Sequence, residues 1–237
     1  GVRIIGKEVC KNNTNLKSVV IPKSVKEIRS SAFYGCTNLR EIELPDGLER
    51  LEYGVFKESG LTSIKVPGSV DFIGIGVFND CMNLERAVLG EGIEQTGERM
   101  FDGCEALKDV SLPKSLKTIS VCTFQWCTGL TEITIPESVT SIHNIAFSNC
   151  KNLREIVLPK GVTVINDYTF NGCNSANFIF LGEITYMGKS AFKDCYNLKE
   201  LRIADDFRHG WSKWNEFLCP LEGCSDQLVV YVKEGSK

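Results

Sequence analysis

A unit of 22 or 23 residues recurs along most of this chain, and that period constrains the fold more than any other feature of the sequence. Two apolar columns keep the same spacing, one mainly of phenylalanine and one mainly of leucine. The columns are Phe33, Phe56, Phe78, Phe101, Phe124, Phe147, Phe170 and Phe192, and Leu16, Leu39, Leu61, Leu84, Leu107, Leu130, Leu153, Ala176 and Leu198. A fixed period of this length is typical of solenoids, in which each unit buries its apolar face against the next.

The consensus of the unit, C-x-x-L-x-x-I-x-L-P-x-x-V-x-x-I-x-x-x-A-F-x-x, predicts its local structure. Its I-x-L part has the period of two that is typical of a strand. The proline that follows lacks a backbone N–H and therefore ends the strand pairing. The V-x-x-I part indicates a second short extended segment, and the remainder predicts a tight turn or a single helical turn.

One copy of the unit carries a family signature. It matches LxxIxLPxxVxxIxxxAFxxC at Leu130, Ile133, Ile135, Pro136, Val139, Ile142, Ala146, Phe147 and Cys150. Through these residues the chain resembles the BspA-like leucine-rich-repeat proteins, over residues 1–204. Gly90 and Gly182 replace the proline, Thr96 interrupts an apolar column, and the turn at 57–61 is shortened. The resemblance implies an α/β-type repeat solenoid, a right-handed leucine-rich-repeat superhelix with short parallel strands and turn-like or short helical connectors.

The period divides the chain into two parts. Residues 1–204 are predicted to form a solenoid of about nine repeats, and residues 205–237 an irregular capping segment that ends in a repeat-like strand. We expect Trp211, Trp214 and Phe217 to cover the open end of the core, because solenoid ends need caps. The chain begins in mid-unit at Gly1, and we expect the natural protein to extend beyond it.

Charge and hydropathy restrict the partners. A formal net charge of −3 provides no basic surface of the kind that binds nucleic acid or anionic membranes. No apolar run reaches the roughly 20 residues of a membrane-spanning helix. The sequence shows no charged-then-apolar leader, so we expect any targeting signal to be absent or already removed. We therefore expect no nucleic-acid partner and no membrane insertion, while the oligomeric state stays open.

Eleven cysteines against two histidines raise the question of a metal or redox site. Residues in one column lie on a line about 4.8 Å apart and cannot surround a zinc ion tetrahedrally. The cysteine column also accepts Asn13 and Ser59, which favours small side chains that bond to a turn backbone. We therefore interpret it as a column of buried structural thiols. Its members are Cys36, Cys81, Cys104, Cys127, Cys150, Cys173 and Cys195.

Four further cysteines lie outside this column. Cys10 takes a phenylalanine position, which favours core packing. Cys122 takes a position that holds serine, glycine or arginine in other repeats, so an exposed reactive thiol and a simple tolerated substitution both fit. Cys219 and Cys224 are close enough in sequence to form a local disulfide if the protein is extracellular.

Catalytic motifs are absent from the sequence. It contains none of the short signatures of α/β-hydrolases, zinc peptidases, P-loop enzymes or dinucleotide-binding domains. The two histidines, His143 and His209, have no partner in the same register. We predict no enzymatic activity, no cofactor and no metal.

The residues that flank the isoleucine of L-x-x-I-x-L are expected to point away from the core. Most of this stripe is polar, but Phe178 and Phe180 fall in it, and exposed aromatic residues are typical of contact hot spots. Burial of the pair under the C-terminal segment is the alternative. Trp126 replaces a Gly, Asn, Asp or Glu and indicates either an exposed aromatic or a filled gap. The candidate partner-binding residues are Phe178, Phe180, Val157, Glu155, Glu132 and Trp126.

Stacked repeats present long ordered faces, which favours a binding function. The resemblance implies a secreted or cell-surface protein that adheres to host or matrix proteins. We predict a non-enzymatic interaction module with a protein partner that the sequence does not identify. A structural spacer within a larger surface protein and a carbohydrate-binding module are the alternatives.

Overall fold

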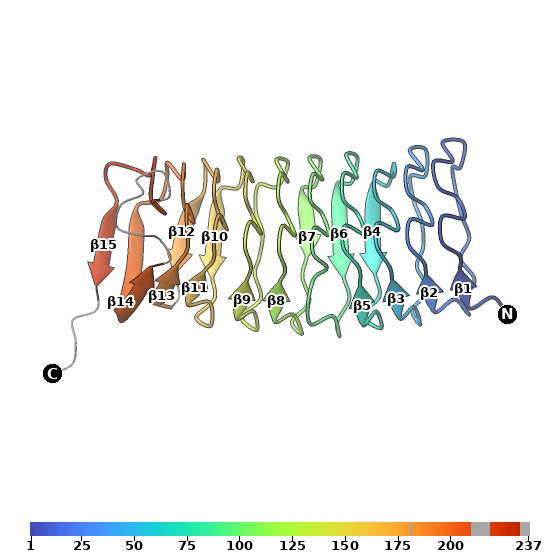
Figure 1. Cartoon of the computed structure of the whole chain (residues 1–237), viewed down its shortest axis with the longest axis horizontal. Coiled ribbons are helices and arrows are strands. Elements are labelled where there is room, and N and C mark those ends of the chain that lie inside the picture. Colours follow the sequence, from blue (N-terminus) through green and yellow to red (C-terminus); the bar gives the residue numbers. More distant parts are fainter. Residues whose placement is uncertain (181, 210–218, 233–237) are drawn as a thin grey trace.

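The computed structural model describes residues 1–180, 182–209 and 219–232, and these residues form one elongated solenoid (Figure 1). All its paired strands are parallel, and β1 and β15 lie at opposite ends. No helix occurs in the described ranges, so the connectors are tight turns and not the short helical turns that the sequence also allowed. The predicted repeat solenoid of parallel strands is confirmed.

Most turns contribute to two parallel ladders, which run along the length of the molecule. The first ladder is built from the I-x-L part of the unit. Its strands are β4 (Ser63–Val66), β6 (Arg86–Leu89), β7 (Asp109–Ser111), β10 (Glu155–Leu158), β12 (Asn177–Phe180), β14 (Glu200–His209) and β15 (Val229–Val232). They pair as β4–β6–β7, β10–β12 and β14–β15.

The second ladder is built from the V-x-x-I part. Its strands are β1 (Ile4–Ile5), β2 (Glu27–Ile28), β3 (Arg50–Leu51), β5 (Phe72–Ile73), β8 (Thr118–Ile119), β9 (Ser141–Ile142), β11 (Val164–Ile165) and β13 (Ile184–Met187). The end of the long strand β14 joins this ladder, because Arg208 and His209 pair with Tyr186 and Met187. One strand therefore connects both ladders near the C-terminal end.

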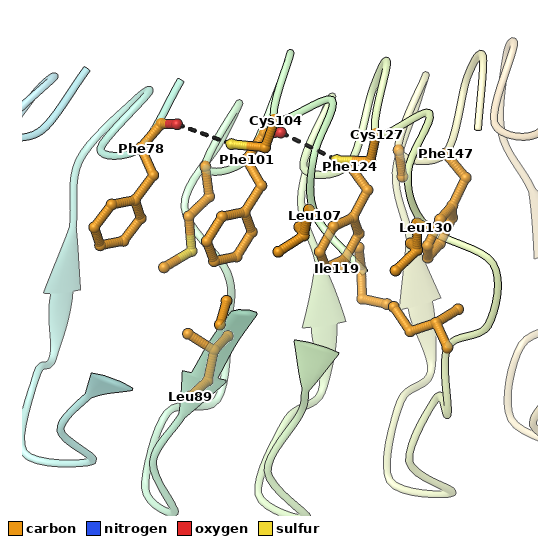
Figure 2. Close-up of a cluster of buried hydrophobic side chains, with 14 of the residues drawn as sticks. Phe78, Leu89, Phe101, Cys104, Leu107, Ile119, Phe124, Cys127, Leu130 and Phe147 are labelled. Atoms are coloured by element: carbon orange, nitrogen blue, oxygen red, sulfur yellow. Dashed lines mark hydrogen bonds between the residues drawn. The ribbon is translucent and has the colours of Figure 1, made fainter. Parts of the chain in front are cut away.

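The core between the ladders is a stack of similar layers. Rings of the phenylalanine column lie face to face, with centroids 5.3 to 5.7 Å apart. Figure 2 shows four of them, Phe78, Phe101, Phe124 and Phe147, beside the leucine column. The ring separation is close to the spacing of paired strands, about 4.8 Å. Each layer therefore buries its apolar residues only against the layers before and after it.

The turns between the ladders require left-handed backbone at two positions per unit. Glycine, asparagine, aspartate and serine fill many of these positions, because they tolerate positive φ best. At Gly172, with φ of 72°, a Cβ atom would lie 2.8 Å from the Oδ1 atom of Asn149 in the previous turn. Glycine at this position adopts the positive φ without strain, and its lack of a Cβ atom leaves room for the adjacent turn.

Beyond β14 the chain returns to the repeat pattern at residues 219–232. The backbone N–H of Phe192 donates to the carbonyl oxygen of Pro220 at 2.8 Å, and β15 pairs with β14. Leu221 and Cys224 pack against the core at the next layer. Trp211, Trp214 and Phe217, the expected cap of the core, lie outside the described residues.

Candidate interaction surface

The cysteine column forms a regular series of hydrogen bonds inside the solenoid. The Sγ atom of Cys150 donates to the carbonyl oxygen of Phe124 at 3.1 Å, and the same bond recurs one turn apart along the stack. Figure 2 shows two further examples, from Cys104 to Phe78 and from Cys127 to Phe101. The seven predicted column cysteines are fully buried. Cys224, which the sequence analysis placed outside the column, makes the equivalent bond to Phe192.

Burial suppresses the chemical reactivity of these thiols. Desolvation raises the pKa of Cys81 to about 11 and that of Cys150 to about 12. A thiol must ionise to act as a nucleophile or metal ligand. The geometry therefore assigns the column to packing and to backbone hydrogen bonding.

The four cysteines outside the predicted column are all free thiols. Cys122 is buried, and desolvation raises the pKa of its thiol, which excludes the exposed alternative. Cys219 and Cys224 are both free thiols, so the local disulfide is not formed in this structure. Cys10 is half-buried and packs against the core, as its phenylalanine position predicts.

The orientation predicted for Phe178 and Phe180 is wrong. Both side chains are buried, with 5% and 7% exposed, and the Phe178 ring packs against the edges of Phe170 and Phe192. The register pairs Ile156 with Phe178, a step of 22 residues where the sequence alignment used 23. A shift of one residue moves every side chain of a strand to the other face. These two phenylalanines therefore belong to the core and offer no contact surface.

The outward face of β10 and β12 carries other side chains. Glu155 and Asn177 form one exposed register pair, and Val157 and Ile179 form the next. Ile179 is 38% exposed and takes the outward position that had been assigned to the phenylalanines. Glu132 continues the same row, because it bridges Glu155 in parallel. The outer face at these turns therefore combines two adjacent carboxylates with two apolar side chains.

Trp126 lies on a turn and is exposed. Its side chain is 42% exposed, and the ammonium group of Lys151 lies 5.3 Å from the ring centroid. The backbone of Trp126 has φ of 59°, in the left-handed region where a bulky residue is unusual. Asn149 and Gly172 hold the same position in the next two turns, and both tolerate it better. Trp126 is thus a strained, exposed aromatic residue in a regular frame.

The first ladder has an interruption at its N-terminal end that the sequence analysis missed. Residues 18–21 and 41–44 have the same strand pattern as β4, yet neither segment is paired, and their backbone groups make no hydrogen bond within the described chain. A depression of about 550 Å³ lies across residues 18–20, 41–44 and 63–65. A second depression shares Val20, Glu43 and Asp46 with it, so the two are continuous.

The repeat and its stacking identify the family. The sequence matches the model of the BspA type leucine rich repeat region in six copies, over residues 3–131 and 117–210. The chain belongs to this family. The BspA-type repeat accounts for both ladders and for the phenylalanine and cysteine columns. None of the curated proteins has a sequence that matches the chain.

Solved structures of bacterial leucine-rich-repeat proteins have the same fold. The leucine-rich-repeat protein TpLRR of T. pallidum is 26% identical, with a TM-score of 0.53, over 60% of this BspA-type chain and 69% of its own. A protein of Eubacterium ventriosum is 18% identical with a TM-score of 0.52, over 99% and 70% of the two chains. The pneumococcal vaccine antigen PcpA is 17% identical with a TM-score of 0.54, over 93% and 56%.

Two further observations concern the described residues alone. Within residues 1–180, 182–209 and 219–232, no three His, Cys, Asp or Glu side chains are grouped so that they could hold a metal ion. In the same ranges, no helix of the length and apolarity needed to cross a membrane is found.

Proposed function

We propose that this chain is a non-enzymatic protein-interaction module of a secreted or cell-surface protein, and that it adheres to a host or matrix protein. Leucine-rich-repeat modules generally act by presenting extended ordered faces to protein partners. The pneumococcal protein of the same fold is a vaccine antigen, which supports a location outside the cell.

One observation supports the proposal, namely that four candidate residues lie exposed or half-buried on two consecutive turns. Trp126 and Glu132 belong to one turn, and Glu155 and Val157 to the next. Trp126 and the two glutamates are exposed, and Val157 is half-buried. An exposed tryptophan and exposed carboxylates on the same two turns are the composition of a contact hot spot with a polar rim. We call these four residues the central patch.

The test is capture of proteins from a panel of purified serum and extracellular-matrix proteins by the immobilised chain. The double variant Trp126→Asn/Glu155→Lys should lose capture without loss of folding. Ser111→Lys is the matched control, because Ser111 is exposed on β7 outside the patch. Capture by the double variant at the level of the unchanged chain would refute the central patch as the contact.

A structural spacer is the second candidate, and the uninterrupted phenylalanine stack favours it. Eight rings in contact over the length of the core make a rod whose layers are all similar. Crossovers between parallel strands are right-handed in nearly all proteins, which supports a right-handed superhelix for this rod, with residues 205–237 as its cap. A spacer would capture no protein in the panel. Binding to a glycan array through Trp126 would instead support a carbohydrate-binding module.

A further inference from the structure

A group of aromatic side chains lies on the second ladder and shares no residue with the central patch. Phe72 on β5 and Arg50 on β3 are register partners, and the guanidinium carbon of Arg50 lies 4.1 Å from the ring centroid of Phe72. The ring of Tyr53 packs at right angles to that of Phe72, with centroids 6.2 Å apart. Tyr53 is 52% exposed and Phe72 is half-buried. We call Arg50, Tyr53 and Phe72 the aromatic cluster, and its rings hold each other in place at the surface.

The aromatic cluster borders a depression of about 470 Å³. The lining includes Asp71 and Phe72 of one turn, and Glu94 and Gln95 of the next. Thr96, the residue that interrupts an apolar column of the repeat, also lines it. The second ladder is interrupted at the same place, since β5 is the last strand of its sheet and Gln95 bridges only the following turn. A departure from the repeat therefore coincides with a hollow beside exposed aromatic rings.

Free polar groups of two kinds surround these rings. Asp71 and Glu94 are exposed, and neither forms an ion pair or a side-chain hydrogen bond with another described residue. Arg50 is exposed as well, and its guanidinium has no ion pair or hydrogen bond within the same described ranges. A guanidinium only donates hydrogen bonds and a carboxylate only accepts them. A ligand at this place therefore meets donors and acceptors next to an apolar ring.

From these observations we propose that the aromatic cluster and its depression bind a neutral glycan. A sugar hydroxyl both donates and accepts hydrogen bonds, so it bonds to Arg50 as well as to Asp71 or Glu94. The C–H groups on one face of a pyranose ring pack against the electron-rich face of an aromatic ring, which Phe72 and Tyr53 provide. Aromatic surface with a small number of polar groups is typical of ligand sites. This inference does not rest on the central patch and adds a second class of ligand at a different place.

Other classes of ligand fit these side chains less well. The two unpaired carboxylates would repel an acidic ligand. A cationic ligand would compete with Arg50, whose guanidinium already lies over the Phe72 ring. A purely apolar ligand would remove the carboxylates and the guanidinium from water without giving them partners, which is unfavourable. A neutral polyol avoids all three costs.

The first test is an array of neutral and sialylated glycans, probed with the fluorescently labelled full chain. Neutral glycans should bind saturably, and the sialylated forms of the same glycans should bind no better. Binding should persist in about 0.5 M NaCl, because contacts with an uncharged ligand are not screened. Absence of saturable binding to any neutral glycan, or binding that salt abolishes, would overturn the proposal.

Variants then locate the site, with the strongest neutral binder of the array titrated by calorimetry. Phe72→Gln should weaken binding at least about tenfold, or about 1.4 kcal/mol. Glutamine holds the equivalent position of the next turn at Gln95, so the fold should tolerate the change, which circular dichroism checks. Asp71→Ala should also weaken binding. The matched control Val164→Gln, at an outward position of β11 that is 39% exposed, should leave the affinity within about twofold.

Saturation-transfer NMR tests the stacking itself. The C–H protons on one face of the bound pyranose ring should receive the most saturation, because that face lies on the rings of the aromatic cluster. Transfer spread evenly over the sugar, or equal affinity of Phe72→Gln and the unchanged chain, would refute the site.

The outcomes separate this inference from the proposed function. Glycan binding that Trp126→Asn abolishes and Phe72→Gln leaves intact would place the glycan at the central patch and overturn the site proposed here. Protein capture that is lost in Phe72→Gln, without any glycan binding, would assign the aromatic cluster to a protein partner instead. The expected result is glycan binding lost only in Phe72→Gln and protein capture lost only in Trp126→Asn/Glu155→Lys.

Discussion

The thiol of Cys150 donates a hydrogen bond of 3.1 Å to the carbonyl oxygen of Phe124, a residue of the preceding turn. The same carbonyl oxygen accepts the backbone N–H of Cys127 at 3.2 Å. The thiol therefore links two turns by bonding to a carbonyl oxygen that already accepts a backbone hydrogen bond within the earlier turn. Because the donor is a neutral S–H group, this link exists only while the thiol stays protonated.

Alkaline pH should destabilise the solenoid. Burial raises the pKa of Cys150 to about 12 and that of Cys81 to about 11, whereas a thiol in an unfolded chain titrates near 8.5. Above that pH the unfolded state releases protons that the folded state keeps, so the free energy of unfolding decreases as pH rises. Each such thiol contributes a slope of about 1.4 kcal/mol per pH unit. Urea unfolding followed by circular dichroism between about pH 8 and 10, in the presence of a reductant, measures it.

The control for this prediction is the variant Cys150→Ser. Serine occurs in the column at Ser59, whose hydroxyl lies 3.4 Å from the thiol of Cys81, so the substitution should fold. Removal of one titrating group should reduce the slope of the free energy of unfolding against pH by the contribution of one thiol. An identical slope in both proteins would contradict the assignment of this pH dependence to the buried thiols.

Truncation of Phe178 and Phe180 should unfold the C-terminal layers. Both rings are buried against the phenylalanine stack, and loss of a buried phenylalanine costs about 3–5 kcal/mol. Phe178→Ser/Phe180→Ser should therefore lower the melting temperature strongly. The matched control is Ile179→Ser, because Ile179 lies between them and is 38% exposed. If the control were the more damaging variant, the register of β12 would be wrong.

The phenylalanine and leucine columns could be predicted from the sequence, because each is a repeated packing requirement. The orientation of Phe178 and Phe180 could not, since the stretch Phe178–Phe180 is apolar at every position and its alternation does not define a face. The steps of 22 residues from Ile165 to Met187 and from Phe170 to Phe192 were the available sign that this turn is one residue shorter. The paired register places the missing residue before Phe178.

The N-terminal interruption was not predictable either. Residues 18–21 and 41–44 have the same apolar alternation as the paired strand β4. Side-chain columns specify which residues face the core, but hydrogen bonding between strands depends on how closely adjacent backbones approach. That separation is a property of the folded stack and leaves no mark in the residue pattern.

Replacement of Trp126 by asparagine should stabilise the protein slightly. Left-handed backbone costs a residue with a Cβ atom about 1–2 kcal/mol, and asparagine tolerates it best after glycine. The lost contact with the ammonium group of Lys151 is worth about 0.5–1 kcal/mol at an exposed site. We expect a net gain of up to about 1 kcal/mol in urea unfolding, accompanied by weaker protein capture.

Trp126→Ala separates the two effects. It removes the ring but provides no side chain that favours positive φ, so it should reduce capture without the gain in stability. Stabilisation of the same size by alanine and by asparagine would show that backbone strain at this position is not the cause.

Charge reversal at Glu155 should also stabilise the free protein. Glu132 and Glu155 are partners across a parallel bridge, and like charges directly opposite each other are unfavourable by a few tenths of a kcal/mol or more. Glu155→Lys should raise the melting temperature at low ionic strength, and the gain should shrink in high salt because exposed charges are screened. Glu155→Gln should give about half of the effect. A gain that does not depend on salt would exclude repulsion as its origin.

The ring stack and the thiol bonds join each turn only to its neighbours, and this has a mechanical consequence. Tension applied between the two ends loads the terminal layer first, because the ring contacts and thiol bonds of the described residues reach no further than the adjacent turn. The molecule should therefore extend in steps, with each released unit of 22 or 23 residues adding roughly 75 Å of contour length. Such a chain would absorb a sudden pull by lengthening while its remaining turns stay folded.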